Sequence, residues 1–223
     1  MTRLLHTEPM LFEHGDRMSR DEFLDRWERM PEVKNAELID GVVYIPWPVS
    51  YAHGCANGFF TAVLATYWAR TPGCQYLPKA TWFMLDSSPQ PDGALRILPE
   101  YGGQSGEMRG FASGSPELAA EVVMSSRSYD LGPKLALYQR AGVQEYAAAL
   151  LEEERMEWRV LERGSYRLMQ PDSEGVFRSQ VFPGLWLDSA AFWAQDGARL
   201  WSALEQGLAS EEHQRFMERL KPL

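Results

Sequence analysis

The apolar residues of the chain recur at helical spacing in several segments. Between residues 52 and 70, aromatic and aliphatic side chains repeat every three or four positions, which predicts an amphipathic helix with one broad face for packing. A shorter helix is predicted over residues 20–30, because Ser19 begins a capping box and Pro31 ends the pattern. Residues 188–223 are also helical in pattern.

Other segments show the patterns of strands and turns. Residues 36–45 place the turn Asp40-Gly41 between two short β-prone runs, which predicts a hairpin. The Gly- and Ser-rich residues 99–115 predict a surface loop. Further strands are predicted by short apolar or alternating runs at residues 75–85, 93–98, 117–124, 143–151, 157–162 and 165–170. The order of these elements indicates an α/β or α+β domain with a mixed sheet flanked by helices.

The composition allows one sizeable core. The chain has 223 residues and 45% hydrophobic content. We expect a loose arm over residues 1–18, one domain over residues 19–187 and packed C-terminal helices over residues 188–223. No run approaches the ~20 apolar residues of a membrane span, and the opening segment lacks a secretory signal, so a soluble, cytoplasmic protein is expected. Cys55 and Cys74 form no zinc-binding motif.

The net charge bears on any nucleic-acid partner. The formal net charge of −9 repels a polyanion at long range. Nucleic acid would therefore have to meet a local basic surface or bind weakly. The sequence leaves open whether basic residues gather on one face, among them Lys79, Arg96, Arg109 and Arg127.

One predicted strand and the helix after it carry the most informative charges. Glu121 stands inside the otherwise apolar strand 117–124, and a carboxylate there is costly to bury unless charge or hydrogen bonds compensate it. A structural ion pair or an exposed strand end would explain it equally well. The next helix is predicted over residues 131–141, where Pro133 fits only because it falls in the first turn.

Lys134 lies on that helix and can reach the strand. Asp130, Lys134 and Tyr138 are four residues apart and so line one helical face, which a strand-loop-helix unit can fold back over the end of the strand. The alternative is an ordinary surface pair between Asp130 and Lys134. Asp92 follows Pro91 where a turn meets a strand, and by itself it is typical of a turn.

Several motifs in order resemble one family. The chain contains Glu37-Leu38-Ile39-Asp40-Gly41, His53, Pro91-Asp92, Glu121-Val122-Val123-Met124-Ser125, Asp130, Lys134, Tyr138, Gly142-Val143, Glu145-Tyr146 and Phe182-Pro183-Gly184-Leu185. From about residue 19 to about residue 192 this order resembles the Uma-type restriction endonuclease family, a domain of unknown function in the PD-(D/E)XK nuclease superfamily. Two positions depart from the family pattern, with Ser126 in place of a proline and Ala147 in place of a tryptophan.

The resemblance implies a restriction-endonuclease-like mixed sheet and a catalytic site. It implies that Asp92, Glu121 and the carbonyl of Val122 bind Mg²⁺ or Mn²⁺, hard ions that prefer oxygen ligands. The superfamily lysine usually stands two positions after the glutamate, where this chain has valine, so Lys134 is expected to supply the ammonium from the helix. Glu37 is a further candidate, as a partner of bound water or a second ion.

His53, Tyr138 and Glu145 are expected to have supporting roles. We interpret His53 as a helix-start or packing residue, and Tyr138 and Glu145 as partners of the ligating groups at most.

Two functions from different classes remain open at this point. The first is a Mg-dependent deoxyribonuclease, motivated by the two carboxylates and the lysine. The second is a catalytically silent nuclease-fold protein that acts as a binding or interaction domain, motivated by the acidic net charge and the two departures from the family pattern. A homodimer through exposed aromatic residues among Trp186, Trp193 and Trp201 is a third, weaker possibility.

Overall fold

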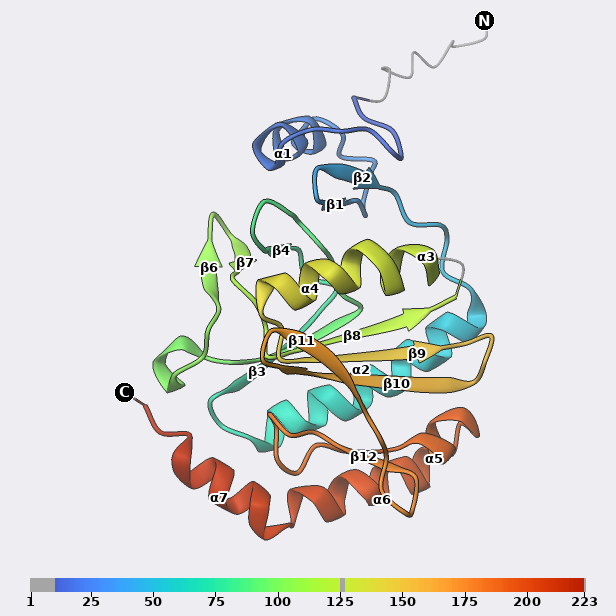
Figure 1. Cartoon of the computed structure of the whole chain (residues 1–223), viewed down its shortest axis with the longest axis vertical. Coiled ribbons are helices and arrows are strands. Elements are labelled where there is room, and N and C mark those ends of the chain that lie inside the picture. Colours follow the sequence, from blue (N-terminus) through green and yellow to red (C-terminus); the bar gives the residue numbers. More distant parts are fainter. Residues whose placement is uncertain (1–10, 125–126, 223) are drawn as a thin grey trace, which may run out of the picture.

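A six-stranded mixed sheet forms the centre of the computed structural model, which describes residues 11–124 and 127–222 (Figure 1). Its strands are β3 (Cys74–Pro78), β5 (Gly93–Ile97), β8 (Leu118–Val123), β9 (Glu145–Leu150), β10 (Arg155–Glu162) and β11 (Ser165–Met169). They lie in the order β11-β10-β9-β8-β5-β3. The pair β8 and β9 is parallel, because a helical segment crosses over between them, and the other pairs are antiparallel.

Three small sheets surround the central one. They pair β1 (Glu37–Ile39) with β2 (Val42–Tyr44), β12 (Val176–Arg178) with β13 (Trp186–Asp188), and β4 (Trp82–Phe83) with β7 (Phe111–Ser113), which also pairs with β6 (Gly106–Met108). The predicted hairpin is confirmed, with Asp40 at φ 51° and Gly41 at φ 75°, the left-handed backbone that a tight turn requires.

Most helical segments begin close to where the sequence places them, but the one expected over residues 131–141 already begins at Arg127. The helices are α1 (Arg20–Glu28), α2 (Tyr51–Arg70), α3 (Arg127–Tyr129), α4 (Leu135–Ala141), α5 (Ser189–Trp193), α6 (Gly197–Leu208) and α7 (Glu211–Arg219). The Ser19 and Ser50 hydroxyls accept hydrogen bonds from backbone N–H groups in the first turns of α1 and α2, which fixes both starts. No helix in the described ranges combines the length and apolar character that a bilayer span requires.

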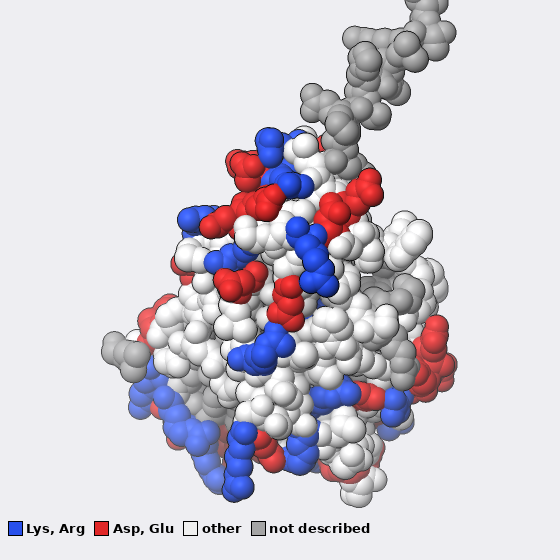
Figure 2. All heavy atoms as spheres, turned by 45° about the horizontal axis from the view of Figure 1, so that its top comes forward, with Lys and Arg blue, Asp and Glu red and all other residues white. Residues whose placement is uncertain are grey.

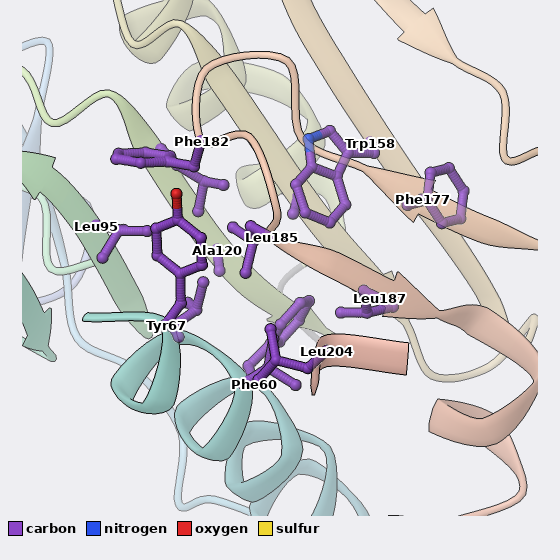
Figure 3. Packing of buried hydrophobic residues seen from close by; sticks show 14 of the residues in the cluster. Phe60, Tyr67, Leu95, Ala120, Trp158, Phe177, Phe182, Leu185, Leu187 and Leu204 are labelled. Atoms are coloured by element: carbon purple, nitrogen blue, oxygen red, sulfur yellow. The ribbon is translucent and has the colours of Figure 1, made fainter. Parts of the chain in front are cut away.

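Two layers of helices cover the central sheet (Figure 1). Helix α2 packs on β3, β5 and β8, and the C-terminal helices lie beyond it, so this face holds the largest cluster of buried side chains. Figure 3 shows Tyr67 and Phe60 of α2 facing Ala120 and residues of the C-terminal segment. Helix α4 covers the other face. Because side chains alternate along a strand, Glu121 of β8 points to the α4 face while Ala120 and Val122 point to the α2 face.

Two predicted segments are corrected by the structure. Within the arm expected over residues 1–18, residues 11–18 are packed: Phe12 and Met18 are buried beside Phe23, and Val43 exchanges backbone hydrogen bonds with this segment. Residues 1–10 lie outside the described part of the chain. The loop expected over residues 99–115 instead contains a 3-10 turn (Pro99–Tyr101) and the strands β6 and β7, which are too short to show an alternating pattern.

Candidate functional site

Three charged residues from separate elements meet beneath the N-terminal hairpin. Glu121 projects from β8, Asp92 precedes β5, and Lys134 ends the segment between α3 and α4. The Lys134 Nζ lies 2.7 Å from Glu121 Oε1, and the Asp92 backbone N–H donates to Glu121 Oε2 at 3.3 Å. All three residues are buried. Lys134 therefore reaches the Glu121 carboxylate, as the spacing predicts, and the pair is buried, which excludes both the surface pair and the exposed strand end.

Glu37 of the hairpin joins the same cluster. Its Oε1 lies 3.0 Å from Lys134 Nζ and accepts the backbone N–H of Gln90, while its Oε2 accepts the Tyr129 hydroxyl at 2.5 Å. A glutamate in a hairpin is more often a solvated surface group, yet Glu37 is buried. The lysine thus bridges two carboxylates that lie far apart in the sequence, one in the N-terminal hairpin and one in β8.

A wide helical turn positions Lys134. Residues Asp130–Lys134 form a π-type segment between α3 and α4, with Gly132 at φ −116° and ψ −106°. The sequence predicts Pro133 in the first turn of a helix. The helical segment already begins at Arg127, so Pro133 lies inside it. Proline lacks a backbone N–H, and the wide turn accommodates this lost donor inside the segment. Asp130 Oδ1 still lies 3.7 Å from Lys134 Nζ, so the predicted pair forms across the irregular turn.

Asp92 has partners that the sequence does not predict. Its Oδ2 accepts the Val122 backbone N–H at 2.9 Å and lies 3.3 Å from His53 Nε2, and its Oδ1 lies 3.5 Å from Lys79 Nζ. His53 is the third residue of α2, so the prediction of a helix-start residue is met, and the ring also reaches the site. A histidine one turn into a helix gives no sequence signal for a contact with a turn about 40 residues later.

Burial and neighbouring charges shift the pKa values of these groups. Burial favours a raised pKa for Asp92, but the His53 hydrogen bond and charge, with the Val122 N–H, outweigh it and lower this pKa. Burial raises the pKa of Glu121 well above its usual range, against the opposing charge of Lys134. Burial works to lower the pKa of Lys134, but Glu121 and Glu37 reverse this and hold the ammonium charged.

A cavity of about 560 Å³ opens onto this cluster. Glu37, Asp92, Glu121 and Lys134 line it together with the loop before α2. This volume lies in the range of small-molecule and nucleotide pockets. The buried carboxylates are therefore accessible to a ligand through the cavity.

The donor set fits a hard divalent cation. Among the described residues no three His, Cys, Asp or Glu side chains are already placed around one ion. Mg²⁺, however, is usually held by one or two carboxylates, with water and substrate oxygens in the other positions. Asp92 and Glu121 offer two such carboxylates. The pairing of β5 with β8 ends at Gly93 and Ala120, so both acids stand just beyond the last paired residues. Since the N–H and C=O of a strand residue point to the same side, the Val122 carbonyl faces Asp92 as its N–H does.

Of the remaining predicted residues, Tyr138 contacts the site and Glu145 does not. Tyr138 donates its hydroxyl to Glu121 Oε1 at 2.9 Å, as a supporting residue should. Glu145 is not beside the site, because it points to the α2 face, where the Ser179 hydroxyl donates to it at 2.7 Å. Ser125 and Ser126, with the loop departure from the family pattern, lie outside the described residues.

Of the basic residues named from the sequence, the three whose side chains the structure describes do not form one patch. Lys79 lies at the site, Arg96 donates to Gln75 of β3, and Arg109 pairs with exposed Asp21. Over the upper part of the face in Figure 2, Lys and Arg side chains are interleaved with Asp and Glu side chains.

The fold and the site together define a class, the nuclease-like α/β proteins with a carboxylate and lysine centre. The model of the Uma2 family, described as "Putative restriction endonuclease", matches residues 20–190, and the chain belongs to this family. A crystal structure described as a "putative nuclease belonging to DUF820" from Anabaena variabilis ATCC 29413 shares the fold, with a TM-score of 0.62 and 15% identity over 79% of this chain and 98% of that one. A search of curated proteins gives no match.

Proposed function

We propose that the protein is a metal-dependent nuclease that hydrolyses DNA phosphodiester bonds at the Asp92, Glu121 and Lys134 cluster. The observation that carries this proposal is the meeting of the three residues, from three separate elements, at a cavity of about 560 Å³. Membership of the Uma2 family supports a nuclease, and the cavity supports access by a substrate.

Each residue has a distinct part in the proposed reaction. Asp92, Glu121 and the Val122 carbonyl would hold Mg²⁺ or Mn²⁺, and this ion would polarise the phosphate and make a water molecule more acidic. Lys134 would place its ammonium beside the non-bridging oxygens, where negative charge develops as water attacks phosphorus and the bond to the leaving oxygen breaks. Glu37 and Tyr138 hold Lys134 and Glu121 in position.

Plasmid cleavage tests the activity. Purified protein incubated with plasmid DNA and Mg²⁺ or Mn²⁺ should nick or linearise it, and Asp92→Asn should reduce the rate at least ~100-fold, the typical size of losing an electrostatic catalytic group. Asp25→Asn is the matched control, because it removes an exposed carboxylate of α1 that pairs with Arg29 on the surface. Equal rates for the two variants would contradict the proposed site.

Thermal unfolding with metal separates an active enzyme from a silent relative. A site with metal at 100 times its Kd should add ~2.7 kcal/mol to the free energy of unfolding. Absence of both metal stabilisation and cleavage, across DNA ends, lengths and both metals, would favour the binding-domain alternative.

A further inference from the structure

An exposed aromatic side chain lines the cavity, and a second one follows it four residues later. In the described residues Trp47 is 81% exposed and Tyr51 is 86% exposed, although large aromatic side chains are usually covered. Trp47 belongs to the loop that lines the cavity, and Tyr51 begins α2 directly after that loop. We call Trp47 and Tyr51 the aromatic lip.

The backbone holds the lip in a restricted shape. Pro46 and Pro48 flank Trp47, and both prolines also line the cavity. Proline fixes φ near −65°, so this loop loses little conformational freedom when a ligand covers Trp47. The Ser50 hydroxyl accepts the His53 N–H at 3.2 Å, which fixes the start of α2 just after the loop. The exposed rings are thus presented on a constrained support.

Without a bound metal ion, the protein's own charges near the cavity leave little attraction for phosphate. Lys134 is held by Glu121 and Glu37, and Lys79 lies 3.5 Å from Asp92. The chain as a whole carries a net charge of −9. A ligand with phosphates must therefore gain affinity from another source, and aromatic stacking on a base is such a source, because every base has a π face.

We propose that the aromatic lip binds an unpaired nucleobase and makes single-stranded nucleic acid the preferred ligand of this site. This inference rests on the proposed nuclease function and adds its substrate class. Asp92 and Glu121 are 9% and 3% exposed, at the base of a cavity rather than on an open surface. A single strand can enter such a cavity, whereas a base within a duplex must first be unstacked at a cost of a few kcal/mol.

Binding without metal tests the proposal separately from hydrolysis. In EDTA, where no cleavage is expected, a fluorescent single strand of about a dozen nucleotides should bind, and Trp47→Ala should weaken binding roughly 10-fold. Trp47→Phe should retain most of the affinity, because it keeps a ring. Trp201→Ala is the matched control, since Trp201 is an exposed tryptophan on α6, away from the residues that line the cavity.

Changes in the nucleic acid test the same proposal. A strand of the same length with abasic sites keeps the phosphates but lacks the bases, and it should bind wild-type protein about as weakly as the intact strand binds Trp47→Ala. The dependence of log K on log salt concentration should have a slope of magnitude below about 2, because few phosphates are neutralised. Duplex DNA of the same sequence should bind more weakly than the single strand.

Several results would overturn the proposal. They are equal affinity of Trp47→Ala and Trp201→Ala, undiminished binding of the abasic strand, or no binding of any strand by wild-type protein. Self-association in sedimentation that Trp47→Ala abolishes would assign the lip to a second copy of the chain instead. If the wild-type protein cleaves plasmid but does not bind the single strand through Trp47, the proposed nuclease function stands and the proposed ligand is wrong. If it binds the single strand through Trp47 but does not cleave DNA with either metal, the nuclease function is wrong and the binding site stands.

Discussion

Two buried glutamates on neighbouring strands of one sheet have opposite surroundings. Glu121 of β8 faces α4 and meets the Lys134 ammonium, the Tyr138 hydroxyl and further carboxylates at a cavity. Glu145 of β9 faces the α2 side and accepts neutral donors from the Ser179 hydroxyl, the backbone N–H groups of residues 180 and 181, and the Trp158 indole. Burial raises both pKa values, so burial alone does not identify a functional acid.

The difference lies in how each carboxylate is compensated. The Glu145 oxygens are fully enclosed by fixed donors that connect β9 with β10 and the segment before β13, which makes this group a structural link. Glu121 accepts the Tyr138 hydroxyl and the Asp92 N–H, but its only charged partner among the described ion pairs is the Lys134 ammonium. It also stands next to other acids, an arrangement that an added cation would stabilise. The predictions below test this contrast.

Removal of Lys134 should have the largest effect. Lys134→Met leaves Glu121 and Glu37 buried without a countercharge, which should lower the free energy of unfolding by roughly 3–5 kcal/mol near pH 7. Urea titration measures this change. The double variant Lys134→Met with Glu121→Gln should recover part of the stability, because it removes one of the uncompensated charges.

The same variant has a predicted pH dependence. Without the ammonium, the folded-state pKa of Glu121 rises further above its unfolded value, so the protonated acid is favoured in the fold. Stability should then be greatest below the unfolded pKa and should fall as pH rises through the raised pKa. Lys134→Met should thus approach wild-type stability as pH falls from about 8 to about 5. A constant difference across this range would contradict the uncompensated-charge explanation.

Truncation of Glu145 should be the next largest effect. Glu145→Ala leaves buried donors of Trp158 and of the backbone at residues 180 and 181 without an acceptor, which should cost roughly 3 kcal/mol. Urea titration again measures it. Metal-dependent stabilisation should persist in this variant, and its loss would show that the two glutamates are not independent.

The sequence predicts the components of the Glu121 site better than their connections. Glu121 is predicted because it is a charge in an apolar strand, and Lys134 because of its spacing along the helix. Asp92 is predicted from the family motif. The contact of His53 with Asp92 joins a helix to a turn far along the chain, and no local pattern records such a contact. For Glu145 the sequence suggests a place near the site that the fold does not give it. The register of β8 and β9, which the sequence does not reveal, puts Glu145 on the opposite face of the sheet from Glu121.

The same limits apply to the fold. Helices and the Asp40-Gly41 hairpin have local signals in caps, periodicity and turn residues, and they are confirmed. Strands of three residues such as β6 and β12 depend on long-range pairing, and a three-residue run cannot establish a period. The packing of Phe12 on Phe23 likewise depends on the folded N-terminal cluster rather than on a pattern within residues 11–18.

Metal stabilisation should distinguish the two glutamates directly. With Mg²⁺ at 100 times its Kd, wild-type protein and Glu145→Gln should each gain ~2.7 kcal/mol, whereas Glu121→Gln should gain little. Both substitutions replace a buried carboxylate by a neutral amide of the same shape, so each controls for the other. Differential scanning fluorimetry over a range of Mg²⁺ concentrations gives the comparison. Equal gains in all three proteins would place the ion elsewhere.

Single hydroxyl deletions should give the smallest effects and the finest test. Tyr138→Phe removes the donor to Glu121, and Ser179→Ala removes a donor to Glu145, so each should cost about 1–1.5 kcal/mol in urea unfolding. Their consequences for metal binding should differ, because only Tyr138 orients a carboxylate of the proposed ion site. Tyr138→Phe should weaken Mg²⁺ binding roughly 10-fold, the lower end of what a supporting hydrogen bond contributes, while Ser179→Ala leaves it unchanged. Equal metal affinities with equal stability losses would mean that Tyr138, like Ser179, serves the fold alone.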